Sequence, residues 1–198
     1  MNNENNPAHF NHRKNLLEID QLKALLKVGY EIDAPMLLPI TRSLFFGYRR
    51  SENFGRDKSG GMPADRSIGM TGLHSVQQTW LSLFPEHQLT SDILPFSRLT
   101  YELRIVAIRE RAGLACWGNN GLRRHYLAYT MWGGVPSNGQ SLLGHFTGDL
   151  AVSQHYNDRP TAVWAREYER LTPLNVLGYE PTPLTPEQMK ASRKRKQK

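Results

Sequence analysis

Apolar residues recur at helical spacing along most of this chain, and this periodicity limits the possible fold more than any other feature of the sequence. In the segment LLEIDQLKALLKVG, one helical face collects four leucines: Leu17, Leu22, Leu25 and Leu26. The segment therefore predicts a first helix. We expect Gly29 to end it, because glycine is a common helix stop.

The same spacing continues further along the chain. The segment APMLLPITRSLFFGYRRSE is apolar and then basic, which predicts a second helix whose start is restricted by Pro35 and Pro39. The segment LHSVQQTWLSLF returns to helical spacing through Leu73, Val76, Trp80 and Leu83. A strong amphipathic helix is predicted over PFSRLTYELRIVAIRERAGL, with Gly113 as its stop. Its apolar positions are Leu99, Leu103, Val106 and Ile108.

The remaining segments complete a mainly helical chain with little room for strands. Two more helices are predicted over GLRRHYLAYTMWGG and NGQSLLGHF, and DLAVSQHYND and TAVWAREYERL close the fold. The glycine-rich stretch after the second helix predicts a loop or short hairpin. We expect a disordered tail over 1–15, one folded domain over 16–178, and a solvated basic tail over 179–198.

The charge balance bears on the partner. Lysine and arginine total 25 against 18 acidic residues, a formal net charge of +7. An excess of this size favours a polyanionic partner, with nucleic acid first and an acidic membrane surface second. The one cysteine, Cys116, rules out an internal disulfide and a multi-thiolate metal site. With no signal peptide and no apolar run that could span a bilayer, we expect a cytoplasmic protein.

Two arginine motifs stand out in the helical segments. LFFGYRRSE ends an apolar helix in the pattern Gly-x-Arg-x-x-Glu, formed by Gly47, Arg49 and Glu52. RAGLACWGNNGLRRHYLAY has an Ala-Gly-Leu helix end, and then Asn120 and Arg123 are spaced by three at the start of the next helix. Arginine is the residue type that binds phosphate oxygens in bidentate geometry.

Two further motifs follow in order. GGVPSNGQSLLGH ends in Leu-Gly-His at His145, and Tyr156 lies eleven residues beyond. Together the four motifs resemble the boxes of the tyrosine recombinases, the phage integrase family. The resemblance runs from about residue 16 to residue 171, and the layout is similar to that of the single-domain fimbrial-switch recombinases.

The resemblance implies a fold and an activity. The fold would be mainly α (α+β), a tyrosine-recombinase-like catalytic domain with a reduced small β-sheet. The activity would be site-specific integration, excision or inversion of double-stranded DNA through a 3′-phosphotyrosyl intermediate, with no cofactor. It also implies a homotetramer on DNA, accessory DNA-bending proteins, a link to a mobile element and a nucleoid location, without membrane association.

The resemblance assigns catalytic roles to Arg49, Arg123, His145, Tyr156, Asn120 and Lys58, and DNA contacts to Arg50, Arg124 and His125. Tyr156 would attack the phosphodiester. Arg49 and Arg123 would clamp the non-bridging oxygens through charge-assisted hydrogen bonds, and Glu52 would orient Arg49 or the following helix. His145 would add a hydrogen bond or a proton transfer.

The second arginine box departs from the family pattern. Asn120 stands where the family has histidine, and an amide donates to phosphate but does not act as an acid or base near neutral pH. A shift by one residue would make Arg124 the second clamp in place of Arg123, with Gly121 at the histidine position. Both assignments stay open.

The general acid is a second departure. The segment available for the family's three-stranded sheet is short, and Lys58 is the only lysine between Lys27 and Lys190. Lys58 follows Arg49 more closely than the family's hairpin lysine normally does, so Arg66 is an alternative general acid.

Two other functions remain open. The first is a catalytically degenerate relative that binds DNA as a regulator or accessory factor. The second is a helical protein without a DNA role, in which the arginines cap helices and His145 and Tyr156 pack. His125 likewise has the simpler interpretation of a surface or packing residue. Tyr168 is a weaker nucleophile candidate because it lies far beyond His145. The tryptophans expected in the core are Trp80, Trp132 and Trp164.

Overall fold

The computed structural model describes residues 16–48, 53, 75–85, 96–114, 121–132 and 160–191. In these ranges the chain forms helices and turns without any strand, which confirms a mainly α fold. The elements are α1 (Ile19–Asp33), the 3-10 turn η1 (Ala34–Met36), α2 (Leu37–Phe46), α3 (Ser75–Leu81), α5 (Arg98–Arg111), α6 (Gly121–Trp132), α9 (Ala162–Tyr168), α10 (Pro173–Leu177) and α11 (Pro186–Ala191). Apart from Asn53, the glycine-rich stretch, with its expected hairpin and reduced sheet, lies outside the described residues.

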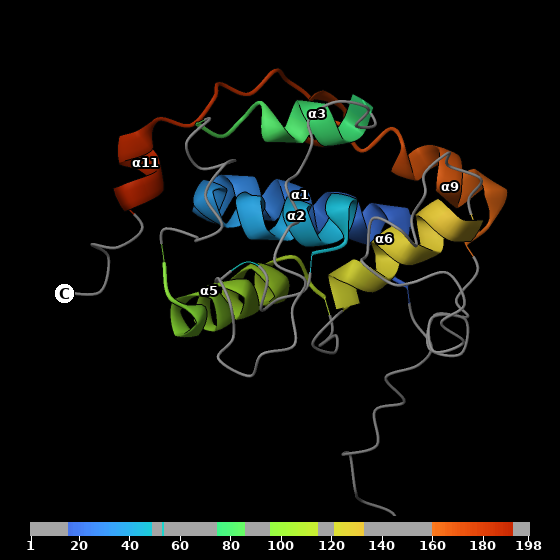
Figure 1. The fold of residues 1–198 in the computed structure, drawn as a ribbon, viewed down its shortest axis with the longest axis horizontal. Coiled ribbons are helices and arrows are strands. Elements are labelled where there is room, and N and C mark those ends of the chain that lie inside the picture. The colour runs from blue at the N-terminus through green and yellow to red at the C-terminus, as the bar shows by residue number, and fades with distance from the viewer. Residues whose placement is uncertain are drawn as a thin grey trace, which may run out of the picture.

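Helix α2 is the central element of the described fold. All ten of its residues are buried, and α1, α3 and α6 pack against it. In Figure 1, α1 and α2 run side by side through the middle, with α3 on one side and α5 on the other. A helix that is covered all round is expected to be mainly apolar, as the sequence LLPITRSLFF is, although its polar residues Thr41, Arg42 and Ser43 are buried as well. The hydroxyl of Thr41 fits this environment because it donates to the Leu37 carbonyl at 2.7 Å.

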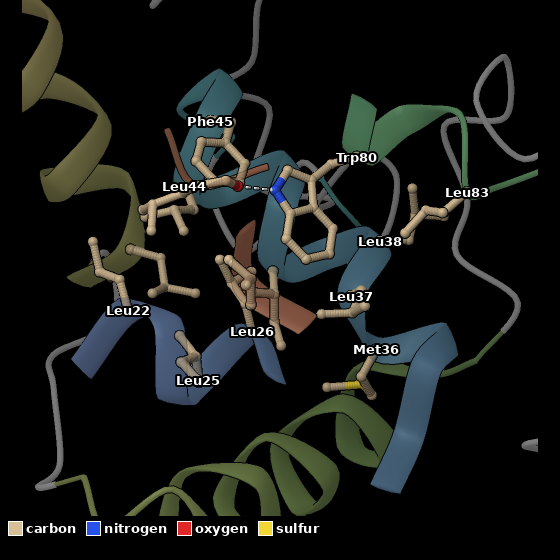
Figure 2. Packing of buried hydrophobic residues seen from close by; sticks show 14 of the residues in the cluster. Leu22, Leu25, Leu26, Met36, Leu37, Leu38, Leu44, Phe45, Trp80 and Leu83 are labelled. Atoms are coloured by element: carbon tan, nitrogen blue, oxygen red, sulfur yellow. Dashed lines mark hydrogen bonds between the residues drawn. The ribbon is translucent and has the colours of Figure 1, made fainter. Parts of the chain in front are cut away.

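The leucine-rich face of α1 forms one wall of the core. Leu22, Leu25 and Leu26 are fully buried, which confirms the face predicted from their spacing. Figure 2 shows these leucines on the side of α1 that faces α2, with Trp80 of α3 on a further side of the same core. Full burial of a leucine side chain stabilises the fold by roughly 1.5–3 kcal/mol.

Helix α1 does not end where the sequence suggests. It begins with a capping box between Glu18 and Gln21 and continues to Asp33, so the expectation that Gly29 ends it is wrong. The presence of glycine inside the helix fits close packing, because a Cβ atom at position 29 would lie 3.1 Å from Cδ2 of Leu37. Glycine at this position therefore lets α1 approach the start of α2.

Helix α5 buries a different face from the predicted one. Leu99 and Leu103 are 66% and 52% exposed, so their assignment to the core is wrong, whereas that of Ile108 is confirmed. The buried positions of this helix are Tyr101, Ile105 and Ile108. Arg104 lies on the same side and forms an ion pair with Asp33 at the end of α1. This pair and the aromatic ring of Tyr101 select the face, because both leucine and tyrosine stripes satisfy helical spacing. The stop at Gly113 is confirmed by its left-handed conformation, with φ 68°.

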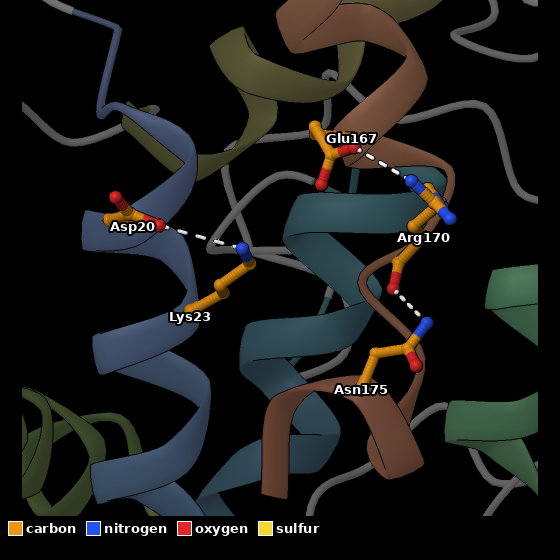
Figure 3. A network of polar contacts seen from close by, with 5 residues as sticks. All are labelled: Asp20, Lys23, Glu167, Arg170 and Asn175. Carbon is orange, nitrogen blue, oxygen red and sulfur yellow. Dashed lines mark hydrogen bonds and ion pairs between the residues drawn. The ribbon is translucent and has the colours of Figure 1, made fainter. Parts of the chain in front are cut away.

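The turn between α9 and α10 is held by local polar contacts (Figure 3). The Asn175 side chain donates to the Arg170 carbonyl at 2.9 Å, and Arg170 pairs with Glu167 at 3.0 Å. Lys23 and Asp20 make a similar exposed pair on α1. Exposed pairs of this kind contribute little to stability, so the turn depends mainly on the backbone carbonyl contact and on helix capping by Thr172.

The chain beyond α10 packs on the core. Leu184 and Met189 are buried, and the Leu184 N–H donates to the Leu83 carbonyl at 2.7 Å. The packed part of the chain thus continues past residue 178, where we expect the basic tail to begin.

Candidate functional site

The structure describes three of the predicted site residues, and all three lie in the first turns of α6: Arg123, Arg124 and His125. The other predicted site residues lie outside the described ranges: Arg49, Arg50, Glu52, Lys58, Arg66, Asn120, His145 and Tyr156. The described part of the site therefore consists of three helices. These are α6, α2, which precedes Arg49 in the chain, and α9, which follows Tyr156.

Arg123 is directed at the end of α2. The side chain is 2% exposed, and its Nη1 donates to the carbonyl of Gly47 at 2.5 Å. Gly47 is the first residue of the Gly-x-Arg-x-x-Glu motif, and Arg49 follows it by two positions. Described residues from the two arginine boxes thus meet, although they are 76 positions apart in sequence.

The end of α2 has a defined geometry. Gly47 adopts a left-handed conformation with φ 67°, which glycine tolerates better than other residues. The N–H of Tyr48 then bonds back to the Arg42 carbonyl at 3.1 Å, the hydrogen bond of a Schellman turn. The Arg42 guanidinium also lies 5.7 Å from the centre of the Tyr48 ring. These contacts fix the direction in which the chain leaves α2.

Arg124 has a different environment from its neighbour. It is half-buried, whereas Arg123 is buried against α2. Consecutive residues of a helix point in directions about 100° apart, so only one of the two arginines can face the end of α2. The Gly47 contact therefore shows that Arg123, and not Arg124, faces the end of α2.

His125 is held inside the protein through both ring nitrogens. Nε2 accepts a hydrogen bond from the Leu17 N–H at 2.6 Å, and Nδ1 lies 2.7 Å from the Gly121 carbonyl, to which it donates. The ring is 2% exposed, and burial lowers the pKa of His125 to about 4. With both nitrogens used, this geometry favours the packing interpretation of His125 over a phosphate contact.

The stability of the protein should depend on pH through His125. Its pKa is about 4 in the folded chain and 6.5 when unperturbed, so the neutral ring stabilises the fold above pH 6.5. That contribution, roughly 3 kcal/mol at most, is lost as pH falls from 6.5 to 4, because protonation would place a charge on a ring that is buried away from water. We expect urea unfolding curves for His125→Asn to lose this part of the pH dependence. Parallel pH profiles for the variant and the wild type would contradict the assignment.

Helix α9 is tied to the same region of α2. The Tyr168 hydroxyl donates to the Leu44 carbonyl at 2.5 Å, and its ring stacks on Tyr129 of α6 with centroids 4.4 Å apart. Phe45 of α2 completes the group, 5.4 Å from the Tyr168 ring. Figure 1 shows α6 and α9 together at one end of α2. This three-helix aromatic group, which we call the aromatic clasp, consists of Phe45, Tyr129 and Tyr168.

The two tyrosines of the aromatic clasp both have a raised pKa but differ in the hydrogen bonding of their hydroxyls. Burial raises the pKa of the Tyr168 hydroxyl well above its ordinary value, so this neutral phenol acts as a hydrogen-bond donor and is unsuited to be a nucleophile. Burial also raises the pKa of Tyr129. Among the described residues, however, the Tyr129 hydroxyl has no hydrogen-bond partner.

Sequence reasoning missed the role of Tyr168. The available signal was its spacing of three from Ala165, which places both residues on the buried face of α9. That signal indicates burial but does not reveal that the hydroxyl meets a backbone carbonyl 124 positions earlier in the chain.

Searches for related proteins do not add to this picture. Neither a protein-family model, nor a curated protein, nor a solved structure matches the chain. The described helices include none long and apolar enough to cross a membrane. Over the same residues, no three histidine, cysteine or acidic side chains gather as metal ligands would.

Proposed function

We propose that this protein cleaves and rejoins double-stranded DNA at specific sites by the chemistry of the tyrosine recombinases. The observation that carries the proposal is the hydrogen bond from Arg123 to the Gly47 carbonyl. A pair of clamp arginines must converge on one phosphate, so their elements must meet. The contact joins the start of α6 to the glycine that precedes Arg49, as a clamp formed by Arg49 and Arg123 requires.

The position of α9 gives further support. Tyr156, the proposed nucleophile, precedes the start of α9 by six residues. Helix α9 is bonded to the last turn of α2 through Tyr168 and stacks on α6 through Tyr129. The described helices that border three of the four motifs therefore pack at one end of α2. The fourth motif, with His145, lies in the sequence between α6 and α9.

The reaction uses the proposed residues as follows. The Tyr156 hydroxyl attacks a DNA phosphorus and gives its proton to His145, a 3′-phosphotyrosyl bond forms, and the bond to the 5′ oxygen breaks. Arg49 and Arg123 neutralise the extra negative charge on the non-bridging oxygens, and His145 hydrogen-bonds to the phosphate. The departing oxygen takes a proton from Lys58. Resealing is the reverse reaction, in which a 5′-hydroxyl attacks the phosphotyrosyl bond, so the bond energy is conserved.

A specific observation favours a second candidate function, DNA binding without cleavage. Asn120 occupies the position at which the family has histidine, and its amide has no acid–base function near neutral pH. A relative that has lost cleavage would keep the hydrogen bond of Arg123 to Gly47, because this bond also has a structural role at the end of α2. It would act on DNA as a regulator or accessory factor.

The test is a covalent trapping assay with nicked duplexes from the DNA that flanks the gene. Wild-type protein should form a protein–DNA adduct that survives denaturation, and Tyr156→Phe should form none, since the variant lacks the attacking oxygen. Tyr179→Phe is the matched control, because Tyr179 is 52% exposed and packs edge-on against Tyr30 of α1. An adduct that persists in Tyr156→Phe would place the nucleophile elsewhere. Salt-sensitive binding of the same duplexes by a wild type that forms no adduct would support the second function.

A further inference from the structure

We infer that Tyr168 is a positioning residue, which sets the helix that follows the nucleophile in register with the helix that leads to the first clamp arginine. The inference deepens the proposed function and rests on it. Its observation is the bond from the Tyr168 hydroxyl on α9 to the Leu44 carbonyl on α2.

The bonded carbonyl belongs to the last turn of α2. In a helix that ends at Phe46, the carbonyls of the last four residues have no partner within the helix. Leu44 is one of these residues, and Tyr168 supplies its hydrogen bond from another helix. Arg123 donates to the carbonyl of Gly47, three residues after Leu44. One side chain from α9 and one from α6 thus bind the C-terminal end of α2. Their two acceptor carbonyls lie within four positions of each other on the chain.

The bond is short and protected from water. Tyr168 is 3% exposed and Leu44 is fully buried. Water cannot replace the tyrosine hydroxyl at a site of this kind, so removing the hydroxyl leaves a buried carbonyl unsatisfied. The helix must then shift or accept that cost. Because reaction rates depend steeply on the alignment of nucleophile and phosphate, even a small shift of α9 should slow cleavage.

The aromatic clasp offers a matched pair of variants. Tyr168→Phe and Tyr129→Phe each remove one hydroxyl from the same pair of stacked rings, whose planes lie within 2° of parallel. The Tyr168 hydroxyl bonds to Leu44, whereas that of Tyr129 has no partner among the described residues. The two substitutions have the same chemistry and differ in the inter-helix hydrogen bond.

The experiment measures two quantities with full-length protein and a nicked duplex from the gene's flanking DNA. These are the dissociation constant for the duplex, by fluorescence anisotropy, and the rate of adduct formation at saturating duplex. For Tyr168→Phe we expect an unchanged dissociation constant and an adduct rate roughly ten- to a hundredfold lower. For Tyr129→Phe we expect wild-type values of both.

Two controls separate positioning from a general loss of stability and from failure of the proposed function. Ser97→Ala removes the N-cap of α5, which accepts from the Thr100 N–H, and should lower the melting temperature without changing the adduct rate. If Tyr168→Phe reacts as fast as Tyr129→Phe while wild type reacts, the positioning role is overturned and the proposed function stands. If wild type itself forms no adduct, the proposed function fails and this inference fails with it.

Discussion

Arg123→Met is expected to reduce adduct formation by about a hundred- to a thousandfold while leaving a folded protein. Loss of one preorganised donor to a charged transition state typically lowers the rate by about that factor. The substitution also removes the charge-assisted bond to the Gly47 carbonyl, which should lower the free energy of unfolding by roughly 1.5–3 kcal/mol. Methionine keeps most of the side-chain volume, so cavity formation contributes little. The adduct rate at saturating DNA and urea unfolding measure the two effects.

Arg124→Met is the matched control for this variant. It removes the same charge from the adjacent position of α6, whose side chain is only half-buried. We expect weaker DNA binding that is restored at lower salt, with a smaller change in the adduct rate of the bound complex. If Arg124→Met loses the rate and Arg123→Met keeps it, the second clamp arginine is Arg124 and the contact of Arg123 with Gly47 is purely structural.

Periodicity predicts which segments of this chain are helical better than it predicts which face is buried. Leu22, Leu25 and Leu26 of α1 and Val76 and Trp80 of α3 are buried as expected. Helix α5 has two stripes that satisfy helical spacing. The stripe with Tyr101 is the one that is buried, beside the ion pair of Arg104 with Asp33, and such tertiary contacts are not contained in the periodicity.

Glycine shows the same limit. Gly113 ends α5 as expected, whereas Gly29 lies within α1, where the Leu37 side chain approaches closely. Gly113 follows a last turn that contains Arg109 and Arg111, a local signal of a helix end, whereas Gly29 follows the more apolar segment KALLKV. The contact that concerns Gly29 is with Leu37 of α2, and a contact between helices is known only when both helices are placed.

The motif leaves Arg123 and Arg124 as alternatives for the second arginine, and the structure adds that Arg123 is the one that faces α2. One position along a helix changes the direction of a side chain by about 100°, and the sequence does not say which direction faces α2. The clasp bond between Tyr168 and Leu44 was beyond sequence reasoning for a related reason. Its acceptor is a backbone carbonyl, which every residue carries, so no residue type marks the site.

Trp80→Ala is expected to lower the free energy of unfolding by about 3–5 kcal/mol, the typical result of removing a fully buried aromatic side chain. Trp80 has no exposed surface, and its ring stacks on Phe45 of α2 at 6.4 Å (Figure 2). Its Nε1 also donates to the Leu171 carbonyl at 2.5 Å. For a chain of this size the melting temperature should fall by roughly 6–20 °C, which differential scanning calorimetry measures.

Trp80 stabilises more than its own helix, because Leu171 lies three residues after the end of α9 and Phe45 belongs to the aromatic clasp. Trp80→Phe keeps an aromatic ring and removes the indole N–H, so it leaves the Leu171 carbonyl unsatisfied at a cost of about 1–3 kcal/mol. Trp164→Phe is the matched control: its indole is half-buried against the same core, and we expect a smaller loss. Equal losses in the two phenylalanine variants would show that ring volume dominates and that the bond to Leu171 contributes nothing. A larger loss for Trp80→Phe would mean that α3 holds the segment after α9 in place, and with it the helix that follows the proposed nucleophile.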